Sequence, residues 1–290
     1  MTLIELLLVI VVLAIVGTAV GRILITSFRV SRDQMVQADM QSNVRLGGLA
    51  LPLELREIGY DSSIVTNAVT SDIEAVGTDW VQFRAMRGIG YTCAISAGLT
   101  EFRVFSPMQG YRNPVQLDGF LLYVENDPNT GVDDQWLPLS VTNIDYASTC
   151  GADPAISFTV TVPDYYGPDL TASQVKVGGP IRFYERMRFG RMVDADGMTY
   201  MGARSISQGD ASYLALAGPV DPVNGIGLRY YRRDGIEVAA AAVNPNDIRT
   251  IDITLRGLTS QAVNLAGTLP RGNNRMLVQT RVALRNTLRH

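Results

Sequence analysis

Residues 1–25, MTLIELLLVIVVLAIVGTAVGRILI, decide how the rest of this 290-residue chain is arranged. From Leu6 to Gly21 the stretch has no charged side chain, and one carboxylate, Glu5, stands immediately before it. A carboxylate beside a continuous apolar helix is costly in lipid or in a protein core unless a cation meets it. The α-amino group of a neighbouring copy of the chain can supply that cation. We therefore expect the stretch to associate with its own kind as well as to anchor the chain in a membrane.

A cleaved secretory signal and an ordinary single-pass anchor are two simpler interpretations of this stretch. A secretory signal has a basic region before its apolar run, but no basic residue precedes Leu6. The sixteen residues 6–21 rise about 24 Å as a helix, against a hydrocarbon core of about 30 Å. As a plain anchor the stretch would therefore need Arg22 to extend toward the headgroups. That interpretation explains the apolar run but not Glu5.

The sequence TLIELL at residues 2–7, with the Val/Ile/Leu run that follows, resembles the N-terminus of mature type IV pilins and type II secretion pseudopilins. In that family a prepilin peptidase removes a short basic leader, and the new first residue, most often Phe, is N-methylated. The glutamate at the fifth position pairs with the amine of the adjacent subunit. The resemblance implies these roles for Met1 and Glu5, with Met1 as the first mature residue. The family's leader does not appear here, so we expect that the numbering starts after cleavage or that the start is truncated.

The orientation in the membrane follows from the resemblance rather than from the visible charges. Arg22, Arg29 and Arg32 follow the apolar run, and alone they would place the C-terminal side in the cytoplasm. The resemblance implies the reverse, because the removed leader supplies the cytoplasmic charge. We expect a single-pass protein of the bacterial inner membrane with its head in the periplasm, and a place in a cell-surface pilus after assembly.

Residues 26–58 are expected to continue the helix with one apolar stripe. The stripe comprises Val36, Met40, Val44, Leu51, Leu55 and Ile58, and the opposite face carries Arg32, Asp39, Arg45 and Glu57. Pro52 should kink the helix or end it near Leu51, and Gly59 is a plausible stop. The helix, about residues 1–58, would lay its apolar stripe on a globular head.

From Tyr60 onward the pattern changes to short strands. Ten runs of strand-forming residues are separated by clusters of Gly, Pro, Asn or Asp: 80–86, 99–105, 120–125, 136–141, 156–162, 181–189, 213–217, 227–232, 248–255 and 276–284. Residues 194–197 and 233–235 are turn signals. The predicted fold class is α+β, with a mainly antiparallel β head. The predicted organisation is a hydrophobic helix at 1–25, an amphipathic helix at 26–59 and a β-rich head at 60–290.

Cys93 and Cys150 are the two cysteines, and both lie beyond the apolar stretch. An even number of cysteines in an exported domain favours a disulfide. Closing a loop of 57 positions contributes about 4 kcal/mol in the chain-entropy model. Buried free thiols and pairing with another chain are the alternatives. The CxxC spacing of redox and zinc sites is absent.

Four further segments resemble PilW-like minor pilins. They are residues 53–60 (LELREIGY), 227–235 (GLRYYRRDG), 248–255 (IRTIDITL) and 280–286 (TRVALRN). The J-type pseudopilins of type II secretion share much of this layout but are usually shorter. Residues 61–220 carry no resemblance that we can name.

The head is not expected to be an enzyme or a nucleic-acid binder. The single histidine is His290, which leaves no Ser/His or Cys/His pair for nucleophilic catalysis. No phosphate-binding glycine loop is present, because residues 225–227 do not extend to GxGxxG. The net charge of −3 does not suit general nucleic-acid binding.

Residues 126–134, NDPNTGVDD, are the one candidate metal site. The candidate calcium ligands are Asp127, Asn129, Asp133 and Asp134. Oxygen ligands at alternate positions around a glycine turn suit calcium, but Pro128 interrupts the loop and the glutamate of an EF-hand is missing. We favour the simpler interpretation, a polar hairpin loop, and expect no other cofactor.

The resemblance therefore implies a minor pilin that primes or caps a type IV pilus near its tip. The alternatives are a J-like pseudopilin, a large major pilin, and a membrane-anchored β domain that never polymerises. The implied partners are other pilins, contacted through the N-terminal helix, the pilus assembly platform, the prepilin peptidase and a tip adhesin. Tip subunits with nothing above them often lack the fifth-position glutamate, so Glu5 suggests a neighbour to pair with.

Overall fold

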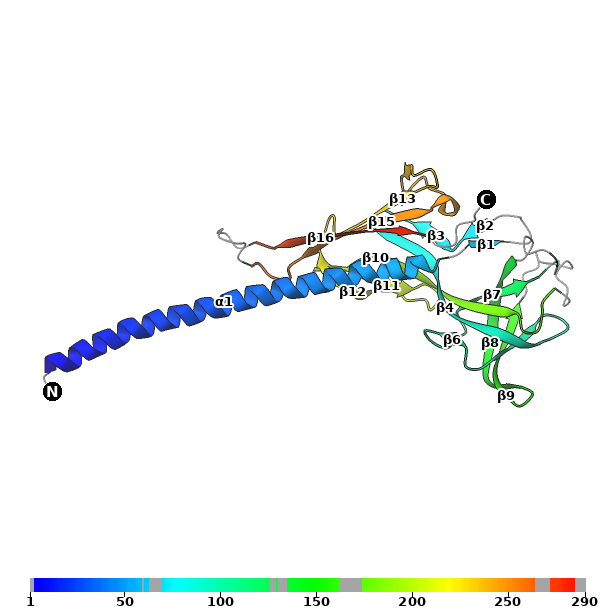
Figure 1. The fold of residues 1–290 in the computed structure, drawn as a ribbon, viewed down its shortest axis with the longest axis horizontal. Helices are drawn as coiled ribbons and strands as arrows, with labels where there is room; N and C mark the ends of the chain where they lie inside the picture. Colours follow the sequence, from blue (N-terminus) through cyan, green and yellow to red (C-terminus); the bar gives the residue numbers. More distant parts are fainter. Residues whose placement is uncertain are drawn as a thin grey trace.

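The computed structural model describes residues 3–58, 60–62, 69–125, 129, 135–161, 174–263 and 272–284. A single long helix, α1 (Leu3–Arg56), leaves the β head at one end and extends far beyond it (Figure 1). The α+β class predicted from the sequence is confirmed. The expectation that α1 could end near Leu51 is wrong, because the helix continues through Pro52 to Arg56. Leu51 and Leu55 are 1% and 0% exposed, so packing on both sides of the proline outweighs the one hydrogen bond that it removes.

The second half of α1 packs on the strands of the head. Most of the predicted apolar stripe is confirmed: Met40, Val44, Leu51, Leu55 and Ile58 are buried, whereas Val36 is only half-buried. Gly47 and Gly48 allow a close approach, because a Cβ at these positions would lie 2.6 Å from the Cβ of Ala217 and 2.8 Å from the side chain of Val278. Small residues at this face therefore let the helix sit directly on the strands.

Six strands form the part of the head that holds α1. They are β11 (Thr199–Ser205), β12 (Leu214–Val220), β13 (Ile226–Tyr231), β14 (Glu237–Val238), β15 (Thr250–Leu258) and β16 (Arg275–Ala283). The helix contacts β12 on one side and β15 and β16 on the other (Figure 1). Along β15 the alternate residues Ile251, Ile253 and Leu255 are buried against the core, as expected for strands with one covered face.

The far end of the head is a sheet that closes on itself, which we call the closed sheet. Its strands are β4 (Trp80–Ile95), β5 (Glu101–Phe105), β9 (Asp153–Thr161), β8 (Gln135–Cys150), β7 (Gly119–Val124) and β10 (Pro180–Val193). They pair in this order, and the pairing of β10 with β4 completes the ring. Phe102, Phe120, Phe158 and Phe183 are fully buried in its interior. Side chains therefore fill this ring as a second core.

The two long strands β4 and β10 join the two cores. They pair from Trp80 opposite Gly190 to Tyr91 opposite Pro180. The register shifts between Phe183, which pairs with Gly88, and Tyr184, which pairs with Met86. Arg87 is thus the extra residue of a β-bulge, a feature that bends a strand and redirects a side chain. The bulge lies where the ribbon passes from the helix-bearing part to the closed sheet.

All ten expected strands are present, and both expected turns have a glycine with positive φ, Gly197 at 75° and Gly235 at 79°. Strand β11 and the shorter elements were not expected from the sequence. These are β1 (Tyr60–Ser62), β2 (Val69–Ser71), β3 (Ile73–Val76), β6 (Gln109–Gly110), β14 and the 3-10 helix η2 (Pro245–Asp247).

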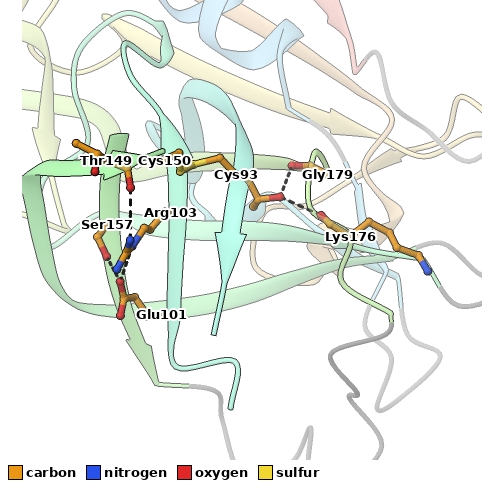
Figure 2. Close-up of a disulfide and its surroundings, with 9 residues drawn as sticks. Cys93, Glu101, Arg103, Thr149, Cys150, Ser157, Lys176 and Gly179 are labelled. Atoms are coloured by element: carbon orange, nitrogen blue, oxygen red, sulfur yellow. Dashed lines mark hydrogen bonds and ion pairs between the residues drawn. A yellow bond between two sulfur atoms is a disulfide. The ribbon is translucent and has the colours of Figure 1, made fainter. Parts of the chain in front are cut away.

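The expected disulfide is confirmed. Cys93 of β4 and Cys150 at the end of β8 are bonded, with their Cα atoms 6.0 Å apart (Figure 2). The two strands are not neighbours in the closed sheet, since β5 and β9 lie between them. The bond therefore adds a cross-link that strand pairing does not provide.

Candidate assembly surface

The first half of α1 is an apolar surface that the head does not cover. Apolar side chains from Leu3 to Val30 are exposed, including Leu3 at 84% and Phe28 at 73%. By length and composition α1 can cross a membrane, and it is the one such helix in the part of the chain that the structure describes. Soluble proteins do not leave so large a continuous apolar surface in water. Its length and composition suit a membrane span or a signal segment.

The second half of α1 also presents apolar side chains away from the head. They are Met35, Leu46, Leu49 and Leu53, exposed by 64%, 58%, 60% and 61%. With Phe28 they fall within a sector of about 60° of the helix, opposite Val44 and Leu51. We call these five residues the outward stripe. Only charged residues were expected on this face, although the spacing of the leucines at 46, 49 and 53 is a sequence signal for an apolar stripe.

Of the two predicted pairing residues, the structure places only the backbone of Glu5, at the free end of α1. Glu5 lies within the helix, its side chain is outside what the structure describes, and Met1 is outside the described residues. Of the calcium candidates, Asp127, Asp133 and Asp134 are likewise outside. Asn129 is an exposed turn residue between the paired strands β7 and β8, which agrees with a hairpin loop. The residues that the structure describes contain no group of three or more His, Cys, Asp or Glu side chains that could hold a metal.

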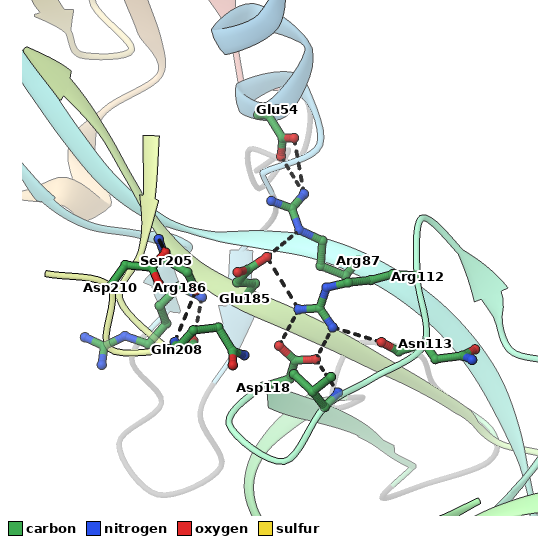
Figure 3. A network of polar contacts seen from close by, with 12 residues as sticks. Glu54, Arg87, Arg112, Asn113, Asp118, Glu185, Arg186, Ser205, Gln208 and Asp210 are labelled. Atoms are coloured by element: carbon green, nitrogen blue, oxygen red, sulfur yellow. Dashed lines mark hydrogen bonds and ion pairs between the residues drawn. The ribbon is translucent and has the colours of Figure 1, made fainter. Parts of the chain in front are cut away.

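A network of ion pairs fixes the end of α1 to the bulge (Figure 3). Arg87 donates to Glu54 of α1 at 2.9 Å and to Glu185 of β10 at 3.0 Å. Arg112 lies 3.4 Å from Glu185 and 2.6 Å from Asp118, whose side chain is fully buried. The bulge thus points Arg87 at both carboxylates. The helix is joined to the two cores at a defined angle.

The charges of this network are well compensated. Burial opposes the ionised form of Glu185, but hydrogen bonds from Ser205 and Arg87 and the charge of Arg112 outweigh it, so the pKa of Glu185 lies below its ordinary value. Burial also opposes the charge of Arg87, and the two carboxylates more than offset that cost and raise its pKa. Arg87 and Glu185 each have two partners of opposite charge, so removing one partner weakens the compensation of a part-buried charge.

Comparison with known proteins finds no matching family model, no similar curated protein and no similar solved structure. The architecture itself is pilin-like. A long N-terminal helix is bare and apolar along its first half and packs along its second half on an antiparallel β head. This helix is the surface through which such a molecule can enter a membrane or associate with its own kind.

Proposed function

We propose that the chain is a subunit of a type IV pilus-class filament, and that it is a minor pilin that primes or caps assembly near the tip. The observation that carries the proposal is the apolar surface of α1. Exposed apolar side chains run from Leu3 past the membrane-length segment to Met35, and after a polar gap they resume at Leu46, Leu49 and Leu53 alongside the head. A plain anchor needs only the first part of that surface.

Lipid covers the first half of α1 before assembly, and neighbouring helices cover it in the filament. Lipid tails are as apolar as leucine, so exchanging lipid for another helix supplies little hydrophobic driving force. The outward stripe is different, because Leu46, Leu49 and Leu53 lie beside the head and face water in the free subunit. Burying them against a neighbour contributes about 3–5 kcal/mol for the three side chains.

Glu5 supplies the register of the filament in this proposal. The Met1 amine of the next subunit meets the Glu5 carboxylate within the apolar bundle. An unpaired carboxylate there costs several kcal/mol, so only one axial offset between helices satisfies it. The proposal involves no catalytic step, because the subunit acts by association. The partners proposed are other pilins, the assembly platform, the prepilin peptidase and a tip adhesin.

The test is mass spectrometry of sheared surface filaments that reads both copy number and the N-terminal peptide. A methylated Met1 in trace amounts beside another dominant pilin is the expected result. A methylated Met1 in the dominant band would make this the shaft protein instead. Absence from filaments, with the protein intact in the inner membrane, would contradict the proposal and favour a secretion pseudopilin or a plain anchor.

A matched pair of variants tests the pairing. Glu5→Gln keeps the shape of the side chain and removes its charge, so incorporation into filaments should fall sharply. Thr18→Val changes another polar residue of the same apolar run, whose hydroxyl donates only to the Ile15 carbonyl at 2.8 Å, and should leave incorporation unchanged. Unchanged incorporation of Glu5→Gln would refute the pairing.

A further inference from the structure

A pocket of about 610 Å³ lies where the end of α1 meets the bulge of β4. We call it the helix-end pocket. Its lining comprises Arg56, Glu57, Met86, Arg87, Gly88, Ile89, Gln109, Gly110, Tyr111 and Arg182. Its volume is within the range of small-ligand sites, about 300–1,000 Å³. The proposed filament contacts run along the outward stripe and do not use it.

Arg182 is the unusual group of this pocket. Its guanidinium is half-buried and stacks on the ring of Trp136, with Cζ 4.3 Å from the ring centroid. Within the described ranges no carboxylate lies at ion-pair distance from it. Asp72, the carboxylate whose charge acts on it, is held by Arg84 at 3.1 Å. Burial lowers the pKa of Arg182 despite that charge, which is the sign of a cation whose desolvation is not compensated.

The neighbouring half-buried arginines show what Arg182 lacks. Arg87 binds two carboxylates and Arg112 binds Asp118, so their charges are matched within the head. An anion in the helix-end pocket would give Arg182 the same compensation. Arg56 is exposed in the last turn of α1 and can supply a second guanidinium to the same anion.

The other lining groups narrow the chemistry of the ligand. Glu57 accepts a hydrogen bond from the Tyr111 hydroxyl at 3.2 Å and retains capacity to accept from further hydroxyls. Gln109 is exposed beside it and can both donate and accept. The ring of Tyr111 with Met86 and Ile89 adds apolar surface. The pocket thus combines sites for a carboxylate, for hydroxyl groups and for a flat apolar face.

We propose that the helix-end pocket binds an acidic sugar, with its carboxylate at Arg182 and Arg56 and its hydroxyls at Glu57 and Gln109. Glu57 and the negative end of the α1 dipole repel a bare inorganic anion. Such an anion also has no hydroxyl group that could donate a hydrogen bond to Glu57. A neutral sugar leaves Arg182 uncompensated. The proposal rests on the end of α1 and the head, and none of its contacts belongs to the outward stripe.

The test is titration calorimetry of the full chain in detergent micelles, with D-glucuronate, D-glucose and sulfate as probes. Saturable binding of glucuronate, at least about tenfold tighter than that of glucose or sulfate, is expected because charge-assisted hydrogen bonds and hydroxyl contacts act together. A Trp80→Phe variant leaves Trp136 as the single tryptophan, and its fluorescence should change on binding. No saturable binding of glucuronate, or equal affinity for sulfate, overturns the proposal.

Matched arginine variants locate the site. Arg182→Gln should weaken glucuronate binding at least about tenfold. Arg188→Gln is the control, because Arg188 is also on β10 and stacks on Trp80 at 4.3 Å, yet it hydrogen-bonds Gln82 and lies outside the pocket. Arg56→Gln alters an exposed side chain, so it should leave the urea midpoint at the wild-type value, and weaker binding then reports a lost contact. Wild-type affinity in both Arg182→Gln and Arg56→Gln would refute the site.

Discussion

Two leucines on opposite faces of α1 test whether one face stabilises the subunit and the other mediates association between subunits. Leu49→Ala and Leu51→Ala remove the same atoms from positions two residues apart. Leu51 is 1% exposed against the head, whereas Leu49 is 60% exposed on the outward stripe. The two variants therefore separate the stability of the subunit from the association between subunits.

The structure sets the magnitude of each effect. Truncating the buried Leu51 should lower the free energy of unfolding by about 2–5 kcal/mol, because it removes apolar burial and leaves a cavity. Truncating Leu49 should change it by less than about 0.5 kcal/mol. In a filament, burial of the 60% of Leu49 that is exposed is worth about 1–2 kcal/mol. Its loss should therefore weaken each subunit contact about tenfold.

Urea unfolding of the full chain in detergent micelles, followed by circular dichroism, measures stability. Quantitative mass spectrometry of sheared filaments measures incorporation. The expected pattern is an unfolding curve for Leu49→Ala that matches wild type, with fewer copies in filaments. If Leu49→Ala destabilises the subunit as much as Leu51→Ala does, the outward stripe is part of the core. If its incorporation is unchanged, the stripe is not an assembly surface.

Three further predictions concern the head. Arg87→Met should lower the free energy of unfolding by about 3 kcal/mol, because it leaves Glu54 without its ion pair and Glu185 with only Arg112 at 3.4 Å. Arg229→Met, whose side chain is 67% exposed, should cost less than about 1 kcal/mol, and equal urea midpoints would contradict this difference. Replacing Cys93 and Cys150 with serine should cost about 4 kcal/mol for a separation of 57 residues, and unchanged hydrogen exchange in β4 and β8 would count against it. Because the pKa of Glu185 lies below its ordinary 4.5 in the folded state, its stabilising contribution is complete above pH 4.5 and is lost as the pH falls through the folded-state pKa. Glu185→Gln should therefore flatten the acid side of the stability curve in urea titrations, and an unaltered acid side would refute that assignment.

The strands that the sequence predicted correctly are those whose pattern matches their environment. Residues 80–86 and 181–189 combine aromatic and β-branched residues with alternating polarity, which marks a strand whatever its partners are. Strand β11 was missed because its sequence, TYMGARS, is rich in small residues. Its place is set by pairing with β10 and β12.

The two candidate sites differ in the same way, because one follows from local sequence and the other from strand pairing. The assembly surface could be anticipated because an apolar run and one adjacent carboxylate are local features of residues 1–25. The helix-end pocket could not. Arg182 and Trp136 are 46 positions apart and meet only because β7 and β8 pair next to β10. No local pattern distinguishes the arginine that lacks a carboxylate from those that have one.

The sequence by itself determined that this protein has a long helix with a bare apolar half, an antiparallel head and one disulfide, since periodicity, charge and cysteine number are properties of neighbouring residues or of composition. Tertiary structure alone decided that the head has two cores, that one sheet closes on itself, that a bulge points Arg87 at the helix end, and that leucines form the outward stripe. The physical reason is that burial and charge compensation depend on which distant segments pack together. Which distant segments pack together is determined by strand pairing over long sequence separations and not by local propensity.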